Sequence, residues 1–437
     1  MRIGLVEFIL ILLIASLAIG PQVALWVDRW MRRAQKTSAA ASRRRAAMQA
    51  QAVAEREYVL HRFRVTARIF TVAALLALLY ALFLRPIEAQ PQPYARPAAP
   101  LSGAAQTGVA AKEEDRLTLE EGQTVNCVRA EDGWIYLAAR TEKRGKTTGS
   151  ALLRMREDGS GLTSILTTEG EITGFDFDPD GNLWLTLLTE NGGALCRAGY
   201  DGWGAAMEQV VTQIDGKALT SPSAVTVGAD GRVYFAVVSA TSAENGLEAA
   251  LRTELMAHTA TGSVYVYDPE ARTVQQVMDG IAGASGLALS PDGGTLYISD
   301  LGNRCVWAVP PRGRELTAGG KGCEVFAEGL PGYPGSLAAD EDGEVWIGFR
   351  WARSGWLEDH AEGTLLRGAA LRLSQNLQEG LFRLGAEDCA AAGYSPDSAL
   401  LEWVDGKTPG SVTTVCPAGN RVWLGSSGGS ETRWVRV

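Results

Sequence analysis

Two kinds of hydrophobic pattern divide the chain. Near the N-terminus, residues 3–19 and 69–84 form continuous apolar runs in which Glu7 is the only charged residue. From about residue 117 onward, short apolar stretches instead alternate with polar turns that contain Asp, Asn and Gly. The first pattern is typical of membrane helices, and the second is typical of β-strands joined by tight hairpins.

The two apolar runs predict an α-helical membrane hairpin over residues 1–85, with helices at about 3–20 and 66–84. Both runs are short for a bilayer, which takes about 20 apolar residues, so flanking residues would lengthen them. Residues 27–68 hold eleven Lys and Arg against three Asp and Glu. Because cytoplasmic loops carry an excess of basic residues, we expect this segment in the cytoplasm and everything after Arg85 outside it.

Other interpretations of this region stay open. The runs could be buried helices of a soluble protein, or the first could be a signal peptide cleaved near Ala18. The basic segment 27–68, with Trp26 before it and Trp30 within it, is expected to contact an anionic leaflet as a helix or to form a solvated loop. Residues 86–116 are rich in Pro and Ala and predict an extended linker.

A strand–turn–strand repeat occupies the rest of the chain. Its turns are centred on Asp132, Asp180, Asp230, Asp292, Asp342 and Gly419, which are 48, 50, 62, 50 and 77 residues apart. A period near 50 residues is typical of one four-stranded propeller blade. Six copies therefore predict an all-β, six-bladed β-propeller over residues 117–437. The two long intervals place insertions at about 241–259, with helical spacing, and at about 351–409.

Charge and cysteine content narrow the choice of partners. The net charge is −9, and since residues 27–68 carry +8 the chain after residue 84 carries −17, which argues against nucleic-acid binding. All six cysteines follow the second apolar run, which fits disulfides in an exported domain. We expect a Cys305–Cys323 pair, and the alternative is six reduced, buried thiols. With no CxxC motif and three His, a zinc site is not expected.

Four segments of the repeat region resemble the strictosidine synthase-like and adipocyte plasma membrane-associated protein-like family of the gluconolactonase superfamily. They are RVYFAVVSA (232–240), GSVYVYDPEARTVQQVMDG (262–280), SGLALSPDGGTLYISDLGNRCVW (285–307) and GLPGYPGSLAADEDGEVWIG (329–348). The resemblance implies a six-bladed propeller with a ligand site at the mouth of its central channel. It also fits anchoring of the chain to the cell membrane through an N-terminal helix.

The catalytic residues of that superfamily do not carry over. Gluconolactonase-type sites hold Ca²⁺ or another divalent cation with Glu, Asn and Asp, and the cation polarises a lactone carbonyl. Here the position of that Asn is Ser285, the position of the Asp is Gly335, and the position of a further Asn that supports the substrate is Ser223. The first-blade Glu falls near Val125, beside Asn126. The resemblance therefore implies a degenerate metal site, no cofactor, and ligand or protein binding. The alternative is a metal-dependent esterase or lactonase, so whether the chain is an enzyme stays open.

Small polar residues near the strand starts make up the candidate ligand site. We expect a small organic or sugar-like molecule to be bound in the channel by Asn126, Ser223, Ser285, Tyr333 and Ser336, unless these residues only fill a narrow channel. Glu171 and Asp300 are the nearest candidates for a channel acid. His258 and His360 fall in the insertions and are expected to be surface or capping residues rather than general bases.

The first 30 residues also resemble the small subunit of the twin-arginine translocase. The resemblance rests on Gly4, Glu7, the apolar run and the Gly20-Pro21 pair that opens an amphipathic stretch. In that family, a short membrane helix turns at Gly-Pro into a helix on the cytoplasmic face. We interpret this as a type of membrane anchor and not as a role in translocation, with the propeller on the extracytoplasmic side of the cell membrane.

Overall fold

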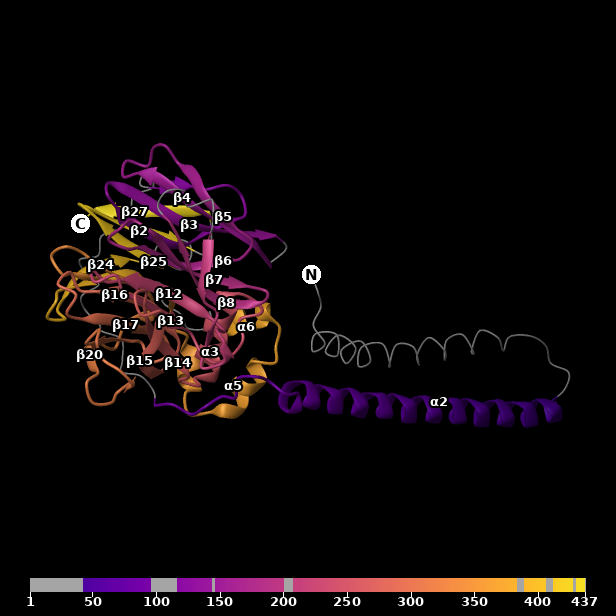
Figure 1. The fold of residues 1–437 in the computed structure, drawn as a ribbon. Helices are drawn as coiled ribbons and strands as arrows, with labels where there is room; N and C mark the ends of the chain where they lie inside the picture. Colours follow the sequence, from indigo (N-terminus) through magenta and orange to yellow (C-terminus); the bar gives the residue numbers. More distant parts are fainter. Residues whose placement is uncertain are drawn as a thin grey trace. The chain divides into compact units, whose positions relative to one another are not determined.

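A computed structural model describes residues 42–95, 116–143, 146–199, 207–382, 389–405, 412–426 and 430–436, which divide into two compact units (Figure 1). One unit holds the N-terminal part up to Ile87 together with Gly368–Gln378, and the other holds the β-structure. The first helix of the expected hairpin and its translocase-like segment lie outside the described residues.

One long helix makes up most of the described part of the first unit. Helix α2 (Ser42–Leu79) continues as one π-helical turn, η1 (Tyr80–Leu84). The part from Gln51 to Leu84 is long and apolar enough to cross a membrane, and its apolar side chains, such as Phe70, are exposed. The helix expected at 66–84 is thus the C-terminal part of a longer one. It begins within the basic segment, so residues 42–68 are helical.

Blades 1 to 3 of the propeller follow one another along the chain. Blade 1 contains β2 (Gln123–Glu131), β3 (Trp134–Lys143), β4 (Lys146–Arg156) and β5 (Thr163–Thr168). Blade 2 contains β6 (Glu171–Phe177), β7 (Leu183–Thr189), β8 (Gly192–Ala198) and β9 (Met207–Val211). Blade 3 contains β12 (Pro222–Val227), β13 (Val233–Val237), β14 (Gly262–Asp268) and β15 (Thr273–Ile281).

Blades 4 to 6 complete the ring. Blade 4 contains β16 (Ala284–Leu289), β17 (Leu296–Asp300), β18 (Cys305–Val309) and β20 (Glu324–Ala327). Blade 5 contains β21 (Gly332–Ala339), β22 (Val345–Ala352), β23 (Cys389–Tyr394) and β24 (Leu400–Asp405). Blade 6 contains β25 (Val412–Ala418), β26 (Arg421–Ser426), β27 (Glu431–Arg436) and β1 (Arg116–Thr118). Short extra strands are β10 (Gln213–Ile214), β11 (Lys217–Ala218) and β19 (Leu316–Thr317).

The sixth blade joins the two ends of the β-structure. Strand β1 pairs antiparallel with β27, so that Leu117 lies opposite Thr432, and the yellow C-terminal strands lie beside the purple first blade (Figure 1). This pairing closes the ring and covers an edge that would otherwise expose unpaired backbone groups. The six-bladed propeller is confirmed, and each of the six predicted turns joins the first two strands of a blade.

Apolar side chains fill the space between neighbouring blades. Six hydrophobic clusters occupy the six junctions, and Trp184, Trp346 and Trp423 are among the largest fully buried side chains. The strands therefore bury both faces, which explains why Val, Leu, Ile and aromatic residues run through them without strict alternation. The core is thus a ring of six apolar layers.

Both predicted insertions leave the propeller between the second and third strands of a blade. The first follows β13 and contains α3 (Leu247–Ala257). The second follows β22 and contains α4 (Gly355–Asp359), α5 (Thr364–Ala370) and α6 (Gln375–Phe382). It is shorter than the expected range 351–409, because β23 and β24 lie inside that range and complete blade 5.

The expected disulfide is not formed. The described cysteine side chains, at Cys127, Cys196, Cys305, Cys323 and Cys416, are free thiols. In the antiparallel pair of β18 and β20, Ala308 lies opposite Glu324, which puts Cys323 at the far end of β18 from Cys305. Four residues along a strand span about 13 Å. A disulfide needs its Cα atoms within about 7 Å, so this register keeps the two thiols apart.

The inner strands of blades 4 and 5 approach so closely that only glycine fits between them. A Cβ atom added at Gly286 would overlap the carbonyl oxygen of Gly335. We expect Gly286→Ala to separate the two blades and lower the free energy of unfolding by about 3 kcal/mol. Gly380→Ala is the control, since nothing lies near its Cβ position in α6. Chemical denaturation measures both, and equal stability of the two variants would contradict this packing.

Candidate functional site

A narrow cavity lies on the axis of the propeller, where the six inner strands meet. Its volume is about 20 Å³, which is the space of roughly one water molecule. All six inner strands line it, together with one residue of β22: Asn126, Cys127, Arg129, Thr173, Gly174, Ser223, Ala224, Val225, Ser285, Gly286, Leu287, Ser336, Leu337, Arg350, Thr413 and Thr414. The channel of this propeller is therefore almost filled by its own side chains.

Four of the five sequence-predicted site residues line this cavity, and each bonds to the next blade. The Asn126 amide donates to the carbonyl of Ile172 (3.1 Å), and the Ser223 hydroxyl donates to that of Ala284 (2.7 Å). Ser285 donates to the carbonyl of Pro334 (2.8 Å), while the Ser336 hydroxyl accepts from the backbone N–H of Val415 (2.7 Å). These side chains thus join inner strands to one another.

The same kind of bond links the two remaining pairs of blades. Thr413 of blade 6 donates its hydroxyl to the carbonyl of Val125 in blade 1 (2.7 Å). Asp176 of blade 2 accepts from the backbone N–H of Val227 in blade 3 (2.9 Å). Every junction in the ring therefore has a side chain of one inner strand bonded to the backbone of the next. Polar residues in the channel are accordingly needed to satisfy buried backbone groups.

Tyr333, the fifth predicted residue, does not line the cavity. Its side chain is fully buried among the apolar residues that lie between the insertions and the propeller, which include Leu247, Leu251 and Leu357. The Tyr333 hydroxyl accepts from the backbone N–H of Ser354 (3.3 Å), and the Arg304 guanidinium lies over its ring at 4.9 Å. We call residues 238–261 and 353–367 of the two insertions the lid, since they lie at the end where the inner strands begin.

Glu171 lies at this end of the channel, where β6 begins, and it is buried. Its carboxylate accepts from the Asn126 amide and from the Arg140 guanidinium, both at 3.0 Å. Its second oxygen accepts from the backbone N–H of Leu247 at the start of α3 (3.1 Å). An anion at a helix N-terminus is favourable because the first N–H groups of a helix have no partner within it. Glu171 therefore joins blades 1 and 2 to the lid.

Asp300, the other candidate acid, is hydrogen-bonded to residues of its own blade and does not line the cavity. It accepts from the backbone and side chain of Asn303 and from the indole N–H of Trp307 (3.0 Å). Burial raises the pKa of its carboxyl, and these hydrogen bonds oppose the shift. Asp300 thus shapes the turn between β17 and β18, and it is not among the residues that line the axis.

The two histidines of the lid are held by local contacts. His258 is the C-cap of α3, and its ring stacks on Tyr94 at 3.8 Å. Burial, together with the nearby Arg304 and Arg367, lowers its pKa to about 3, so this imidazole is neutral at physiological pH. His360 shares a hydrogen bond between Nδ1 and the carbonyl of Trp356 (2.7 Å). The capping role expected for a lid histidine fits the position of His258.

Arg367 ties the segment before the propeller to the lid. Its guanidinium is buried and donates to the carbonyls of Met256 and Ala361 (both 2.9 Å) and of Gln92 (2.5 Å). It also lies 5.0 Å from the centre of the Tyr94 ring. Residues 88–95 of the expected linker therefore pack on the lid, while residues 96–115 lie outside the described part of the chain.

Arg350 is a channel residue that the sequence reasoning missed. It comes from the second strand of blade 5, its side chain is 95% buried, and it lines the axial cavity. Its Cβ lies 3.3 Å from the place where a side chain at Gly335 would begin. The resemblance described above implies a metal-binding Asp at the position of Gly335. The sequence signal that could have identified it is an arginine within the otherwise apolar stretch VWIGFRW (345–351). The preceding strand carries Gly335 and so leaves space for a long side chain.

The residues around the axis do not fit a divalent cation. In the described part of the chain, no three His, Cys, Asp or Glu side chains are placed to hold a metal ion. Glu171 is the acid at the channel mouth, and it is ion-paired with Arg140. The axial lining carries two guanidinium groups and no carboxylate. Calcium and magnesium sites are built from several oxygen ligands that include carboxylates, so this donor set is unsuited to either ion.

The fold and the axial site define a class: a six-bladed β-propeller with a narrow axial cavity. The sequence matches the family described as SMP-30/Gluconolactonase/LRE-like region over residues 148–372, which is just over half of the chain. The protein therefore belongs to the SMP-30/gluconolactonase/LRE-like family, as the sequence motifs predicted.

Similar proteins include the two kinds of relative that the sequence motifs resemble. The chain is 26% identical to protein strictosidine synthase-like 6 of Arabidopsis thaliana over 49% of this chain and 50% of that protein. It is 24% identical to adipocyte plasma membrane-associated protein Hemomucin of Drosophila melanogaster, over 56% of this chain and 42% of that protein. The chain thus spans about half the length of the curated relatives it matches. A gluconolactonase from Xanthomonas campestris has the same fold, with 20% identity, a TM-score of 0.51, and coverage of 81% of this chain and 99% of that one.

Glu254 in α3 makes the stability of the lid depend on pH. Burial raises the pKa of this carboxyl to about 7, although it accepts hydrogen bonds from Thr259 (2.6 Å) and from the N–H of Ala260 (2.9 Å). A raised carboxyl pKa stabilises the folded state below the ordinary value and loses that effect as pH rises through about 7. We therefore expect stability to fall between pH 5 and 8.

The variant Glu254→Gln should remove this component of the pH dependence. Relative to the parent protein, it should gain up to about 3 kcal/mol between pH 5 and pH 8, since each pKa unit corresponds to about 1.4 kcal/mol. Thermal unfolding across this pH range measures the difference. Glu157→Gln, at an exposed position, is the matched control and should follow the parent protein. Parallel pH curves for Glu254→Gln and the parent would show that Glu254 does not titrate in this range.

Proposed function

We propose that this protein is a membrane-anchored β-propeller that binds a ligand or a protein partner and does not carry out metal-dependent hydrolysis. The observation that carries the proposal is the Arg350 guanidinium on the propeller axis, beside the position that aligns with a metal-binding Asp of the family. A fixed positive charge there opposes a divalent cation, and no carboxylate in the axial lining offsets it.

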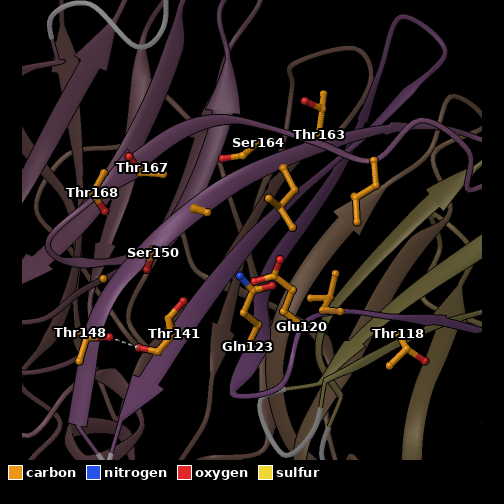
Figure 2. A pocket seen from close by; sticks show the side chains of 15 residues that line it. Thr118, Glu120, Gln123, Thr141, Thr148, Ser150, Thr163, Ser164, Thr167 and Thr168 are labelled. Carbon is orange, nitrogen blue, oxygen red and sulfur yellow. Dashed lines mark hydrogen bonds between the residues drawn. The ribbon is translucent and has the colours of Figure 1, made fainter.

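The axial cavity is too small for an organic ligand, so we assign the ligand site to a groove on blade 1. Its volume is about 560 Å³, within the range of small-molecule sites. Figure 2 shows hydroxyl side chains from β4 and β5, including those of Thr163 and Thr167, around the groove, with Gln123 and Glu120 on the opposite side. Such a lining, rich in neutral donors and acceptors, suits a small sugar-like or other uncharged polar molecule.

A combined activity and binding assay on the full chain tests both parts of this proposal. We expect no turnover of an arylester and lactone panel, and no change in thermal stability when EDTA is replaced by Ca²⁺. In saturation-transfer NMR with uncharged mono- and disaccharides, we expect at least one ligand whose signal falls severalfold in Thr167→Leu. The control Thr273→Leu changes an exposed threonine on blade 3 and should bind as the parent does.

Each arm of that assay can contradict the proposal separately. Calcium-dependent turnover would establish the alternative, a metal-dependent esterase or lactonase, with Glu171 as the acid at the channel mouth. Binding that survives Thr167→Leu, or no binding by any sugar tested, would remove the groove as the ligand site.

The membrane part of the proposal rests on helix α2. Its Gln51–Leu84 portion has the length and composition of a span, and Ile69, Phe70 and Leu76 expose apolar surface that water would disfavour. The basic residues before it favour a cytoplasmic N-terminal side, on an anionic leaflet, with the propeller outside. A relative named as plasma membrane-associated agrees with membrane attachment.

Fractionation and a topology reporter test the anchor. We expect the full chain to stay in the membrane pellet after alkaline extraction, and a phosphatase fused to its C-terminus to be active only outside the cytoplasm. The double change Leu75→Arg and Leu76→Arg should move most of the protein to the soluble fraction, since each central Arg costs about 3 kcal/mol in a bilayer. Leu401→Arg, at an exposed propeller position, should have no effect. An inactive phosphatase fusion would place the propeller inside the cell instead.

A further inference from the structure

The charge of the axial cavity is opposite to that of the metal site the family is built around. Two of its lining residues, Arg129 and Arg350, carry guanidinium groups, and none of the sixteen is an Asp or a Glu. Arginine stays protonated in proteins at any physiological pH. Arg129 lies 4.0 Å from the Asp176 carboxylate, so Arg350 is the guanidinium of this lining without a carboxylate within 4.0 Å among the described residues. A narrow space next to such a charge favours an anion over a cation or a neutral molecule.

Arg350 lacks the partner that a buried guanidinium normally has. Its side chain is 95% buried, yet its Nε has no hydrogen-bond acceptor among the described residues, and it forms no ion pair within 4.0 Å there. Burial lowers its pKa, opposed by Glu248 and Glu171 and reinforced by Arg140. Those two glutamates have closer partners, because Glu171 bonds to Arg140 and Glu248 to Arg252. A buried charge without a direct partner is costly, so Arg350 is suited to a bound counterion.

Further donors line the same cavity. The hydroxyls of Ser336 and Thr414 accept from the backbone N–H groups of Val415 (2.7 Å) and Val128 (3.1 Å), which leaves each hydroxyl proton for another acceptor. The guanidinium of Arg129 donates to the carbonyl of Val128 (3.2 Å) and lies 4.0 Å from Asp176. Hydroxyl and guanidinium donors together are the groups that bind an anion.

Size then decides which anion fits. A volume of about 20 Å³ accommodates a particle of roughly the size of one water molecule, which excludes phosphate, sulfate and carboxylates. We propose that the axial cavity binds a single halide ion, chloride under physiological conditions, next to Arg350 at the place where the family holds its divalent cation. The chloride ion neutralises the guanidinium and helps to hold blade 5 to the rest of the ring.

This inference goes beyond the proposed function and fails separately from it. The groove on blade 1 and the membrane helix play no part in chloride binding. A protein that binds chloride on its axis but no sugar in the groove would keep this inference and lose the ligand site. A protein that hydrolyses lactones only with Ca²⁺ would lose the non-catalytic function, and the measurements below would still report directly on the axial ion.

The direct test is a crystal of the full chain grown in sodium bromide. Bromide replaces chloride and scatters anomalously, so we expect an anomalous peak on the propeller axis beside the Arg350 guanidinium. No variant is needed for this measurement. Ordinary water density without an anomalous peak would overturn the proposal, and so would a peak that appears only elsewhere on the surface.

Thermal unfolding in detergent micelles gives a second, independent readout. At constant ionic strength, replacing sodium methanesulfonate by sodium chloride should raise the unfolding temperature by about 2 °C or more, since an ion that binds only the folded state stabilises it. Methanesulfonate is too large for the cavity. Arg350→Met removes the charge while keeping similar bulk, and it should abolish the chloride effect. The control Arg312→Met, at an exposed position on blade 4, should retain it.

The proposal also predicts which of the parent protein and Arg350→Met is the more stable at each chloride concentration. In chloride-free buffer, Arg350→Met should be as stable as the parent or more stable, because it no longer buries an uncompensated charge. In 200 mM chloride this order should reverse. A chloride effect of equal size in the parent and in Arg350→Met would place the ion elsewhere and overturn the assignment. If Arg350→Met does not fold, the bromide crystal still decides the question.

Discussion

The hydrogen bonds between neighbouring inner strands are the constraint on which the rest of the structure depends. Each blade contributes a small polar side chain, such as Ser223, Ser285 or Thr413, that bonds to the backbone of the next blade. These bonds satisfy backbone groups that water cannot reach, and they hold the strands close enough for apolar clusters to fill every junction. Such close packing leaves an axial cavity of only about 20 Å³.

That constraint also bears on the donor groups around the axis, where no three His, Cys, Asp or Glu side chains of the described residues are placed to hold a metal ion. Carboxylates at the strand starts would provide ligands for a cation, but serine at the same positions provides donors for the neighbouring backbone. The acid that does lie at the channel mouth, Glu171, is used to bind Arg140 and the first N–H of α3. Glu171 and these serines are therefore hydrogen-bonded to other groups of the protein itself.

The lid adds a second layer of charge and apolar packing over this end of the channel. Glu171 joins the propeller to α3, and Arg367 joins α3 to the segment around Gln92 and Tyr94. Because the lid is fixed at several points, access to the axis from this end would require breaking buried hydrogen bonds and an ion pair. The open groove on blade 1 imposes no such cost on a ligand.

The sequence by itself determined the fold class, because each repeat carries its own local signals. An Asp-Gly turn between two apolar strands forms the same hairpin wherever it occurs, and a period of about 50 residues makes the number of blades countable. The family resemblance placed Ser223 and Ser285 in the channel, Ser336 was predicted beside them, and all three line the axial cavity. The apolar run at 69–84 likewise identified the C-terminal part of α2.

Only the tertiary structure decided what those residues do. Whether a serine faces a ligand or bonds to the next blade depends on a strand about 50 residues away, and its own neighbours in sequence do not record that contact. The position of Arg350 on the axis, the partners of Glu171 and the register that separates Cys305 from Cys323 are all contacts across strands or blades. Local sequence patterns specify strands and turns. Which partner a buried charged side chain has depends on the distant segments that pack around it, so only the tertiary structure shows it.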